Sequence, residues 1–452
     1  MPDIVLVILA VIFVLGVAIN IHEFGHFIVA KMFGMRVEAY SFFGLGPRIW
    51  GFKIGHTDYR ISAIPLGAYV KLYGDEETAP LEGKADTAEK VPDSELYELR
   101  PRWQKFLVMV GGPFMNIVLA LAIPFFGVWF YGAPAMPAPI VGLVSPGGAA
   151  EVAGFKPGDR IIGFDGIENP TWDRIEKDAL ISPEKTIPVA VIRDGKKVEF
   201  TVTPKKEVRN GSSLGILGLA PELGAEPVVA NMIESGSAAE AAGLQKGDKI
   251  LTANGGAVKN SQDLINKIRA AKETPLNLVV ERSGANVDVV VTPKMQGDVP
   301  RIGVGFNMGS MERDPATIGQ AAAFAVNANL DILRLTGRVF GQIFSGERGV
   351  QDAGLAGPVG IVQLISQVVL GAGLAGLFSI LAVISLNLGV FNLLPIPMLD
   401  GGQIVVLGIE KVMSWFGKTL SMAVREKIQM VGLVAILGLM AFTLFLDISR
   451  LF

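Results

Sequence analysis

Four stretches of the sequence are long and apolar enough to cross a lipid bilayer, and they restrict the possible folds more than any other feature. They lie at about 4–33, 106–131, 374–394 and 431–445, and a more broken apolar segment from 359 precedes the third. A membrane-spanning helix needs about 20 such residues. The chain is 50% hydrophobic and 18% charged, against about 25% charge in soluble domains. We therefore expect a polytopic α-helical membrane protein with about four transmembrane helices and a soluble portion.

The positions of Lys and Arg predict how these helices are oriented. Basic residues cluster between the first and second stretches and again between the third and fourth. Such clusters mark the cytoplasmic loops of membrane proteins. Both termini and the long segment at about 132–358 are therefore predicted to lie on the opposite, outer side.

Charge and cysteine counts exclude several classes of protein. The formal net charge is −3, so no basic excess is present to neutralise phosphates, and no nucleic-acid partner is expected. The absence of cysteine excludes a disulfide scaffold, an iron–sulfur cluster and a thiolate zinc site. There are three histidines, and two of them, His22 and His26, lie inside the first apolar stretch.

The outer segment contains an internal duplication. Residues 145–166 and 234–255 align without a gap at an offset of 89 residues, with ten identities in 22 positions. In each copy the pattern predicts a short helix closed by a glycine, a second helix, and a strand hairpin. The expected hairpin turns are Asp194-Gly195 and Ser283-Gly284.

The duplicated pattern resembles a pair of tandem PDZ domains, which would cover about 136–205 and 218–294. PDZ domains bind an extended peptide by adding it as a strand to an open sheet edge. Peptide or substrate segments are therefore expected partners of this pair. The alternative is that both copies are spacers without a ligand.

The first apolar stretch contains the sequence His-Glu-Phe-Gly-His at residues 22–26. Residues four apart on a helix share a face, so the imidazoles of His22 and His26 are expected to point to the same side. They would supply two nitrogen ligands to one Zn²⁺ ion, with Glu23 as general base for water at the metal. The alternative is a proton relay or an ion path, because ionisable groups inside a bilayer are costly. The spacing of the histidines favours zinc.

A hydrolytic zinc site needs a third protein ligand and an open position. His56 is available but lies in a polar segment outside the apolar stretches. Asp400 lies at the cytoplasmic end of the third stretch, at the depth of the two histidines, in the sequence Asn-Leu-Leu-Pro-Ile-Pro-Met-Leu-Asp-Gly-Gly. Its prolines and glycines predict irregular backbone, which at membrane depth needs protein or a water-filled cavity to satisfy it. Asp400 is the favoured ligand; its alternative role is to cap a helix over 403–415.

The His-Glu-Phe-Gly-His sequence, the Asp-Gly-Gly stretch and the inserted PDZ pair together resemble the site-2 protease family of intramembrane zinc metalloproteases, over nearly the whole chain. The resemblance implies that His22, His26 and Asp400 bind one zinc ion. It implies that Glu23 is the catalytic acid and base. Asn392 is implied as a second catalytic residue, which holds the substrate or stabilises the transition state.

The same resemblance implies further substrate contacts. Gly44 and Gly46 lie in Phe-Gly-Leu-Gly-Pro, which is similar to a membrane-dipping β-loop of the family, here expected within 35–73. An edge strand of this loop would hold a substrate in extended form; the alternative is a packed β-layer without that role. Pro397 belongs to the proline-bearing segment that is implied to bind the substrate. Residues 112–116 resemble a motif of the family's second span.

The implied function is regulated intramembrane proteolysis, the cutting of peptide bonds within transmembrane segments of single-span membrane proteins, such as anti-sigma factors or remnant signal peptides. The implied location is a bacterial cytoplasmic (inner) membrane, with the helices in the lipid bilayer and the PDZ pair on the periplasmic side, where it controls substrate access. A role in stress response follows from the same resemblance. The alternative is a membrane PDZ scaffold with a structural metal site and no peptidase activity.

The expected domains are a first membrane part at 1–131, the PDZ pair, and a second membrane part at 312–452. The second part begins with a partly amphipathic helix at 316–344, which either lies on the outer membrane surface as a clamp or only connects its neighbours. Residues 75–101 are acidic, polar and proline-bearing, and are predicted to form a flexible cytoplasmic loop.

Overall fold

The chain forms two compact units in the computed structural model. We call the first the membrane unit; it comprises Met1–Tyr131, Ala316–Phe340 and Leu355–Phe452. The second, the insert unit, comprises Gly132–Pro315 and Gly341–Gly354. The residues described are 2–64, 67–74, 91–209, 212–224, 226–296, 299–306, 313–351, 356–418 and 420–449.

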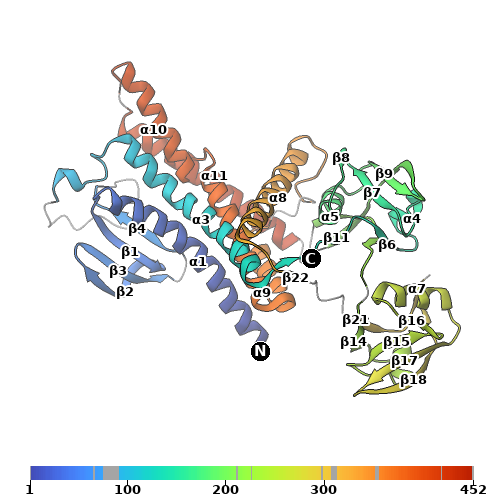
Figure 1. Ribbon diagram of the computed structural model, residues 1–452. Helices are drawn as coiled ribbons and strands as arrows, with labels where there is room; N and C mark the ends of the chain where they lie inside the picture. The colour runs from blue at the N-terminus through green and yellow to red at the C-terminus, as the bar shows by residue number, and fades with distance from the viewer. Residues whose placement is uncertain are drawn as a thin grey trace. The chain divides into compact units, whose positions relative to one another are not determined.

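The membrane unit contains the four apolar helices that the sequence predicts (Figure 1). Within the described part of the chain, four helices are long and apolar enough to cross a membrane. The fourth is longer than its predicted apolar stretch at both ends, and its first two turns include Arg425, Glu426 and Lys427. Their bounds are α1 Pro2–Met32, α3 Arg102–Tyr131, α9 Pro358–Asn392 and α11 Met422–Ser449.

Helix α9 is broken at Gly373, whose φ of 57° and ψ of −140° are not helical. Its 35 residues would measure about 52 Å as one straight helix, well beyond a hydrocarbon core of about 30 Å. The part after Gly373 corresponds to the third predicted stretch, and the part before it to the broken apolar segment from 359. Both parts pack against α1, with Ile365 before the break and Leu381 after it in one apolar cluster.

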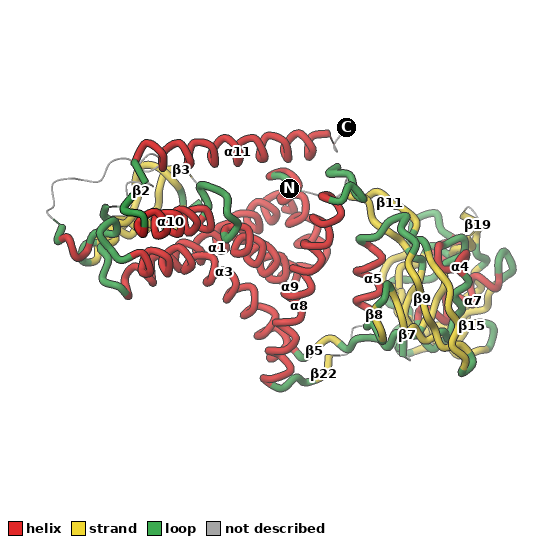
Figure 2. Tube along the Cα trace, turned by 90° about the horizontal axis from the view of Figure 1, so that it is seen from above, coloured by secondary structure: helices red, strands yellow, loops and turns green. Residues whose placement is uncertain are grey.

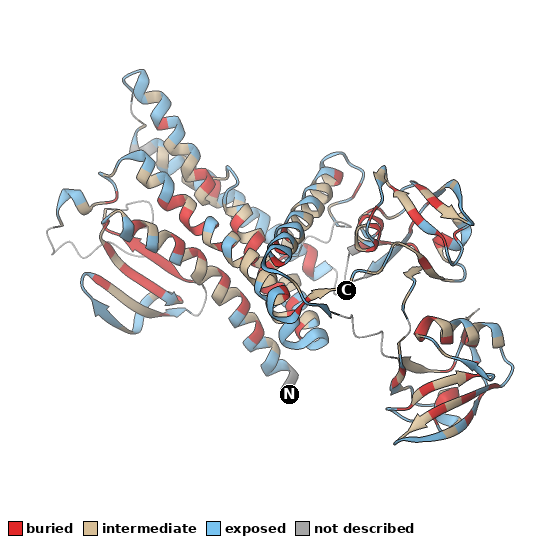
Figure 3. Ribbon diagram, in the orientation of Figure 1, coloured by how far each residue is buried: buried red, intermediate tan, exposed pale blue. Residues whose placement is uncertain are grey.

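Four strands follow α1 and form a sheet in the order β2-β3-β1-β4. Strand β1 pairs with β3 in parallel and with β4 antiparallel, so β4 is an edge strand. Strands β1 and β4 are largely buried, and their side chains pack against α1 and α3. Strand β2 is largely exposed (Figure 3), and its exposed apolar side chains include Trp50. Strands are thus confirmed within 35–73. Their bounds are β1 Val37–Phe43, β2 Leu45–Ile54, β3 Thr57–Ile64 and β4 Tyr69–Leu72.

Three further elements complete the membrane unit, and α8 continues a short way into the insert unit. The helix predicted at 316–344 is present, and Asn329 of that helix donates to the carbonyl of Ala120 on α3 at 3.1 Å. The loop predicted at 75–101 falls largely on residues 75–90, which lie outside the described residues. The bounds are η1 Asp93–Glu95, α8 Ile318–Phe344 and α10 Asp400–Trp415.

The insert unit shows the predicted duplication. It is rich in strands, whereas the membrane unit is mostly helical (Figure 2). Each copy has a short helix, a longer helix and a strand hairpin at the expected places. The hairpin turns are as expected, because Asp194 and Ser283, with φ of 49° and 53°, precede glycines that also have positive φ. The helix bounds are α4 Ala149–Ala153, α5 Trp172–Leu180, α6 Ala238–Ala241 and α7 Ser261–Ala271.

The strands of each copy form one main sheet, in the order β10-β9-β7-β8 in the first copy and β18-β17-β15-β14-β21 in the second. Strands β5 and β22 pair with each other at the two ends of the insert. The strand bounds are β5 Ala133–Pro134, β6 Val141–Val144, β7 Arg160–Phe164, β8 Ile167–Glu168, β9 Ile187–Arg193, β10 Lys196–Val202, β11 Lys205–Arg209, β12 Ser212–Ile216, β13 Leu219–Pro221, β14 Val228–Ile233, β15 Lys249–Ala253, β16 Gly256–Ala257, β17 Leu276–Arg282, β18 Ala285–Val291, β19 Lys294–Gln296, β20 Val299–Arg301, β21 Val304–Phe306 and β22 Arg313–Asp314.

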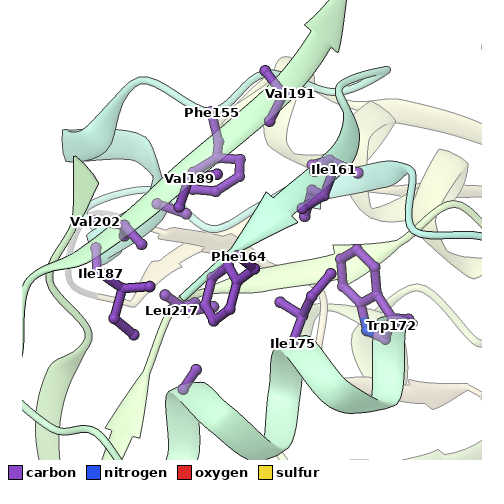
Figure 4. Packing of buried hydrophobic residues seen from close by; sticks show 14 residues of the cluster. Phe155, Ile161, Phe164, Trp172, Ile175, Ile187, Val189, Val191, Val202 and Leu217 are labelled. Carbon is purple, nitrogen blue, oxygen red and sulfur yellow. The ribbon is translucent and has the colours of Figure 1, made fainter. Parts of the chain in front are cut away.

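Each copy has its own apolar core. In the first, Ile175 and Trp172 of α5 pack against Phe164 and the inner side chains of β9 (Figure 4). The core of this copy includes Leu217, and the core of the second includes Ile302. Both residues lie beyond the ends of the sequence resemblance. A strand after each hairpin also joins its copy, because β13 pairs with β6 and β21 pairs with β14.

Candidate metal centre

Helices α1 and α3 approach each other closely at a pair of glycines. A Cβ atom on Gly25 would collide with the backbone carbonyl of Gly111. A Cβ on Gly112 would collide with His26 Nε2 and lie 2.9 Å from His22 Nε2. The absence of side chains at these positions leaves the space that the two imidazoles occupy.

The structure brings together His22, His26 and Asp400. The Nε2 atoms of the two histidines are 3.2 Å apart. Asp400 places one carboxylate oxygen 3.1 Å from His22 Nε2 and the other 3.5 Å from His26 Nε2. All three side chains are largely removed from solvent, with Asp400 the most accessible at 14%.

These separations fit a zinc ion. Zinc ligands at about 2.0–2.2 Å and tetrahedral angles lie roughly 3.3–3.6 Å from one another. The imidazole nitrogens are 3.2 Å apart, and each lies 3.1 or 3.5 Å from a different oxygen of Asp400, so each pair of residues is close to that range. Two neutral imidazoles and one carboxylate are also a donor set that catalytic zinc uses, with a fourth position left for water or substrate.

Asp400 is the first residue of α10, and it does not cap that helix. The N-cap is Leu399, and no side-chain cap hydrogen bond is present at this helix start. The carboxylate is instead directed at the two histidines. The backbone before it is irregular, as expected: Met398 has a φ of 79°, a left-handed conformation that residues other than glycine seldom adopt.

The second ring nitrogen of each histidine faces α3. His26 Nδ1 lies 2.7 Å from the carbonyl oxygen of Val108, and His22 Nδ1 lies 3.2 Å from the side-chain nitrogen of Asn116. Sequence reasoning placed Asn116 in a family motif but gave it no role. The signal that was available is a single asparagine one helical turn after Gly112, inside an apolar stretch.

Glu23 and Asn392 lie beside the same three residues. Both line a cavity of about 420 Å³ together with His22, His26 and Asp400. The side-chain nitrogen of Asn392, the last residue of α9, is 3.5 Å from His22 Nε2. The cavity is also lined by Tyr69 and Val70 of the edge strand β4, by Gly46, and by Gln403 of α10.

Local packing accounts for the residue type at two of the positions implied to contact substrate. Gly44 has a φ of 91°, and a Cβ there would press against the carbonyls of Ser62 and Ile64. Pro397 packs closely against Gly432 of α11. Neither is among the described residues that line the cavity. His56 is exposed in the turn between β2 and β3, away from the cluster of three ligands.

Comparisons with known proteins place the chain among related sequences. A family model described as Peptidase family M50 matches residues 10–439. The regulator of sigma-E protease RseP of Salmonella typhimurium is 31% identical over 476 residues, which cover 98% of each chain. RseP of Escherichia coli is 30% identical over 466 residues and 97% of each chain. The regulator of sigma E protease of Haemophilus influenzae is 30% identical over 459 residues, 97% of this chain and 98% of that one.

Proposed function

We propose residue roles from one premise: the chain belongs to peptidase family M50 and is a site-2 type intramembrane zinc metalloprotease, similar to regulator of sigma-E protease. This membership makes it an enzyme, and not the ion path or the inactive scaffold that the sequence left open. The proposed zinc ligands are His22, His26 and Asp400. The observation that carries the proposal is that one ligand atom from each of these residues lies within 4.8 Å of the other two, inside the membrane unit.

The bound zinc ion would polarise the scissile carbonyl and activate water. Glu23 is proposed as the acid and base of the reaction. It takes a proton from the attacking water as the new C–O bond forms, and it gives that proton to the amide nitrogen as the C–N bond breaks. Its place next to His22 on α1, lining the same cavity as the ligands, supports this role.

Asn392 is proposed to stabilise the negative charge that develops on the carbonyl oxygen. Its side-chain nitrogen lies 3.5 Å from His22 Nε2, so an N–H donor stands beside the metal position. A donor that is already in place when charge develops lowers the barrier more than one that must be reoriented.

The edge strand β4 is proposed to hold the substrate. Tyr69 and Val70 of β4 line the cavity, and an edge strand can pair with an added extended segment. Pairing would unwind the helix of a transmembrane substrate and expose its peptide bonds, which a helix shields. Gly46 lines the same cavity, which supports its proposed contact with the substrate. Gly44 and Pro397 do not line it, and we propose that they position neighbouring residues that contact the substrate.

The central test is co-expression of the chain with candidate single-span membrane proteins, comparing the wild type with Glu23→Gln. We expect cleavage by the wild type and a loss of about 10²–10⁴-fold in the variant, the usual contribution of general acid–base catalysis. Zinc content and membrane insertion should stay unchanged, because Glu23 is not a proposed ligand. Equal cleavage by both proteins would remove Glu23 from the mechanism.

We also propose that both termini and the insert unit lie on the periplasmic side of a bacterial inner membrane. The clustering of Lys and Arg supports this orientation. Reporter fusions after residue 75 and after Lys418 should report cytoplasm, and a fusion after residue 211 should report the periplasm. A periplasmic signal at residue 75 would invert the orientation.

The duplicated domains, at about 136–205 and 218–294, are proposed to be PDZ domains that filter substrates by size. A folded pair on the route to a site inside the membrane would keep bulky outer domains away from it. In-frame deletion of 136–294 should therefore permit cleavage of substrates with large outer domains. The filter is refuted if such substrates stay uncut while short ones are still processed.

A further inference from the structure

The two histidines of the metal centre differ in what holds their second ring nitrogen. His26 Nδ1 faces the carbonyl oxygen of Val108 at 2.7 Å. A carbonyl can only accept, so Nδ1 carries the proton and Nε2 keeps a lone pair directed at Asp400. His22 Nδ1 lies 3.2 Å from the side-chain nitrogen of Asn116, and an amide can donate from its nitrogen or, turned over, accept at its oxygen. The protonation of His22 is therefore set by Asn116.

Asn116 is fully buried where three helices of the membrane unit meet. Ser385 of α9, also fully buried, donates from Oγ to the backbone carbonyl of Asn116 at 3.0 Å and lies 3.3 Å from its Oδ1. Gly389, one turn further along α9, allows this approach, because a Cβ there would lie 2.9 Å from the carbonyl of Pro113. Burying two polar side chains in membrane-spanning helices costs free energy. Such residues therefore usually serve a function.

When His22 binds zinc, only one orientation of the Asn116 side-chain amide gives every donor an acceptor. A histidine that binds zinc through Nε2 carries its proton on Nδ1 and needs an acceptor there. The nitrogen and oxygen of an amide occupy the same shape, and half a turn exchanges them. With Oδ1 facing His22, the amide nitrogen faces Ser385 Oγ, which accepts from it while donating to the backbone carbonyl. With the nitrogen facing His22, the ring proton would have to sit on Nε2, where zinc binds.

We propose that Asn116, held in place by Ser385, is a positioning residue that accepts the Nδ1–H of His22 and keeps His22 Nε2 free for the metal. The inference rests on the proposed zinc site and deepens it. The Nδ1 atom of His22 then has a side-chain partner, which a substitution can remove. The Nδ1 atom of His26 faces a backbone carbonyl, which no substitution removes. The role of Asn116 can therefore be tested without touching a ligand.

The first test is the zinc affinity of the purified full-length protein, measured by competition with a chelator. Asn116→Leu should weaken zinc binding by about 10- to 100-fold, the usual effect of removing a partner of a metal-bound histidine. Asn116→Asp should restore the affinity to within a few-fold, because a carboxylate also accepts from Nδ1. Ser385→Ala should have a smaller effect in the same direction as Asn116→Leu.

Asn329→Leu is the matched control. Asn329 is also a buried asparagine in the membrane unit, but its amide donates to the carbonyls of Ala120 and Ala325 and does not contact a histidine. Its loss should leave zinc affinity at the wild-type level. A general loosening of the helix bundle would instead weaken both leucine variants.

The second test is ¹⁵N NMR of the zinc-loaded protein labelled at histidine, which contains only three such residues. The wild type should show Nδ1 protonated in both His22 and His26. In Asn116→Leu only the His22 Nδ1 proton should exchange faster with solvent, since it has lost its acceptor. A purely structural defect would not be confined to one ring.

The outcomes separate this inference from the proposed zinc site. Wild-type affinity in Asn116→Leu, or an affinity in Asn116→Asp as weak as in the leucine variant, overturns the role of Asn116. If the His22→Ala variant still binds zinc as the wild type does, the zinc site itself is overturned. If Asn116→Leu does not fold, Ser385→Ala and Asn116→Asp decide: wild-type affinity in Ser385→Ala overturns the proposal, and a loss there with retention in Asn116→Asp supports it.

Discussion

One buried polar arrangement of the insert unit differs in kind from the polar cluster of the membrane unit. In the insert unit a buried ion pair occurs twice: Asp159 pairs with Arg193 at 2.7 Å, and 89 residues later Asp248 pairs with Arg282 at 2.7 Å. Each aspartate is at most 1% exposed, and each also accepts a backbone N–H from the residue three positions before it. Each arginine also donates to a glycine carbonyl at the end of the first helix of its copy.

In the membrane unit, one cluster of polar side chains comes from four separate motifs and converges on one point. His22, Asn116, Ser385 and Asp400 belong to α1, α3, α9 and α10. A contact that two diverged copies share belongs to their common fold. Polar groups that are costly to bury in a membrane, and that meet only through long-range packing, are better explained by chemistry. We therefore interpret the repeated ion pair as structural and the cluster of the membrane unit as functional, and the following experiments test that interpretation.

The largest effect is expected for Asp400→Asn. The substitution keeps the size of the side chain but removes the charge that helps to neutralise Zn²⁺ in a low-dielectric site. We expect complete loss of peptidase activity and loss of most of the bound zinc, with the four spans still inserted. Metal analysis of the purified protein and cleavage of a co-expressed substrate measure these effects.

His56→Ala is the control for this experiment, because His56 is the remaining histidine and lies outside the cluster. It should leave zinc content and activity nearly intact. If zinc survives in Asp400→Asn and falls in His56→Ala, the ligand assignment is wrong and His56 takes its place.

A large effect is also expected for Gly112→Ala, without any change in charge. The added methyl group would collide with His26 Nε2 and crowd His22 Nε2, so the imidazoles must move and the ligand spacing is lost. We expect most zinc and activity to disappear. Gly127→Ala, on the same helix, is the matched control, since nothing lies within 4 Å of a Cβ at Gly127. Normal zinc binding in Gly112→Ala would show that the close packing of α1 and α3 does not set the site.

An intermediate effect is expected for Arg282→Met, confined to the second copy. It leaves the buried carboxylate of Asp248 without its arginine partner, so the local stability of this copy should fall. Arg193→Met should do the same to the first copy, and the two losses should add because the cores are separate. Hydrogen exchange of β17 and β9 measures both. A fall in zinc affinity would contradict the structural role assigned to these pairs.

The same pair predicts a dependence on pH. The hydrogen bond from Arg282 holds the pKa of Asp248 below its ordinary value. A carboxylate with a lowered pKa in the folded state adds stability above its unfolded pKa of about 3.9, and this stability is lost as the pH falls below that value. Protection of β17 should therefore decrease on acidification below about pH 4. Asp248→Asn should remove this dependence, and an unchanged pH profile in that variant would assign the effect to another group.

Local patterns in the sequence predicted local structure well. The helix of the His-Glu-Phe-Gly-His sequence, the four helices of the duplicated copies and both hairpin turns depend on neighbours in the chain, and they are where the patterns placed them. Asp400 was favoured because few carboxylates lie at membrane depth.

Contacts between distant residues could not be predicted in this way. His22 and Asn116 are 94 residues apart, and Asp159 and Arg193 are 34 apart. Whether such residues meet depends on how closely helices and strands pack, which glycines such as Gly25 and Gly112 decide. The break of α9 at Gly373 was indicated only as an interruption of an apolar stretch, because a glycine in a helix is permissive and does not by itself require a break.

The smallest effect tests the duplication at its most local level. Gly154 and Gly243 follow the first helix of each copy with φ of 92° and 77°, and nothing lies within 4 Å of a Cβ added to either. Alanine at these positions has space but must adopt a left-handed conformation, which costs about 1 kcal/mol. Gly154→Ala and Gly243→Ala should thus destabilise their own copies equally, as measured by local hydrogen exchange, with no change in zinc affinity. Equal losses would show that both copies still need a left-handed backbone conformation at this position, although their core side chains have diverged. If the two losses of stability differ by much more than about 1 kcal/mol, the backbones of the copies have diverged as well. The presence of the Asp–Arg pair in both copies would then no longer show that the pair is structural.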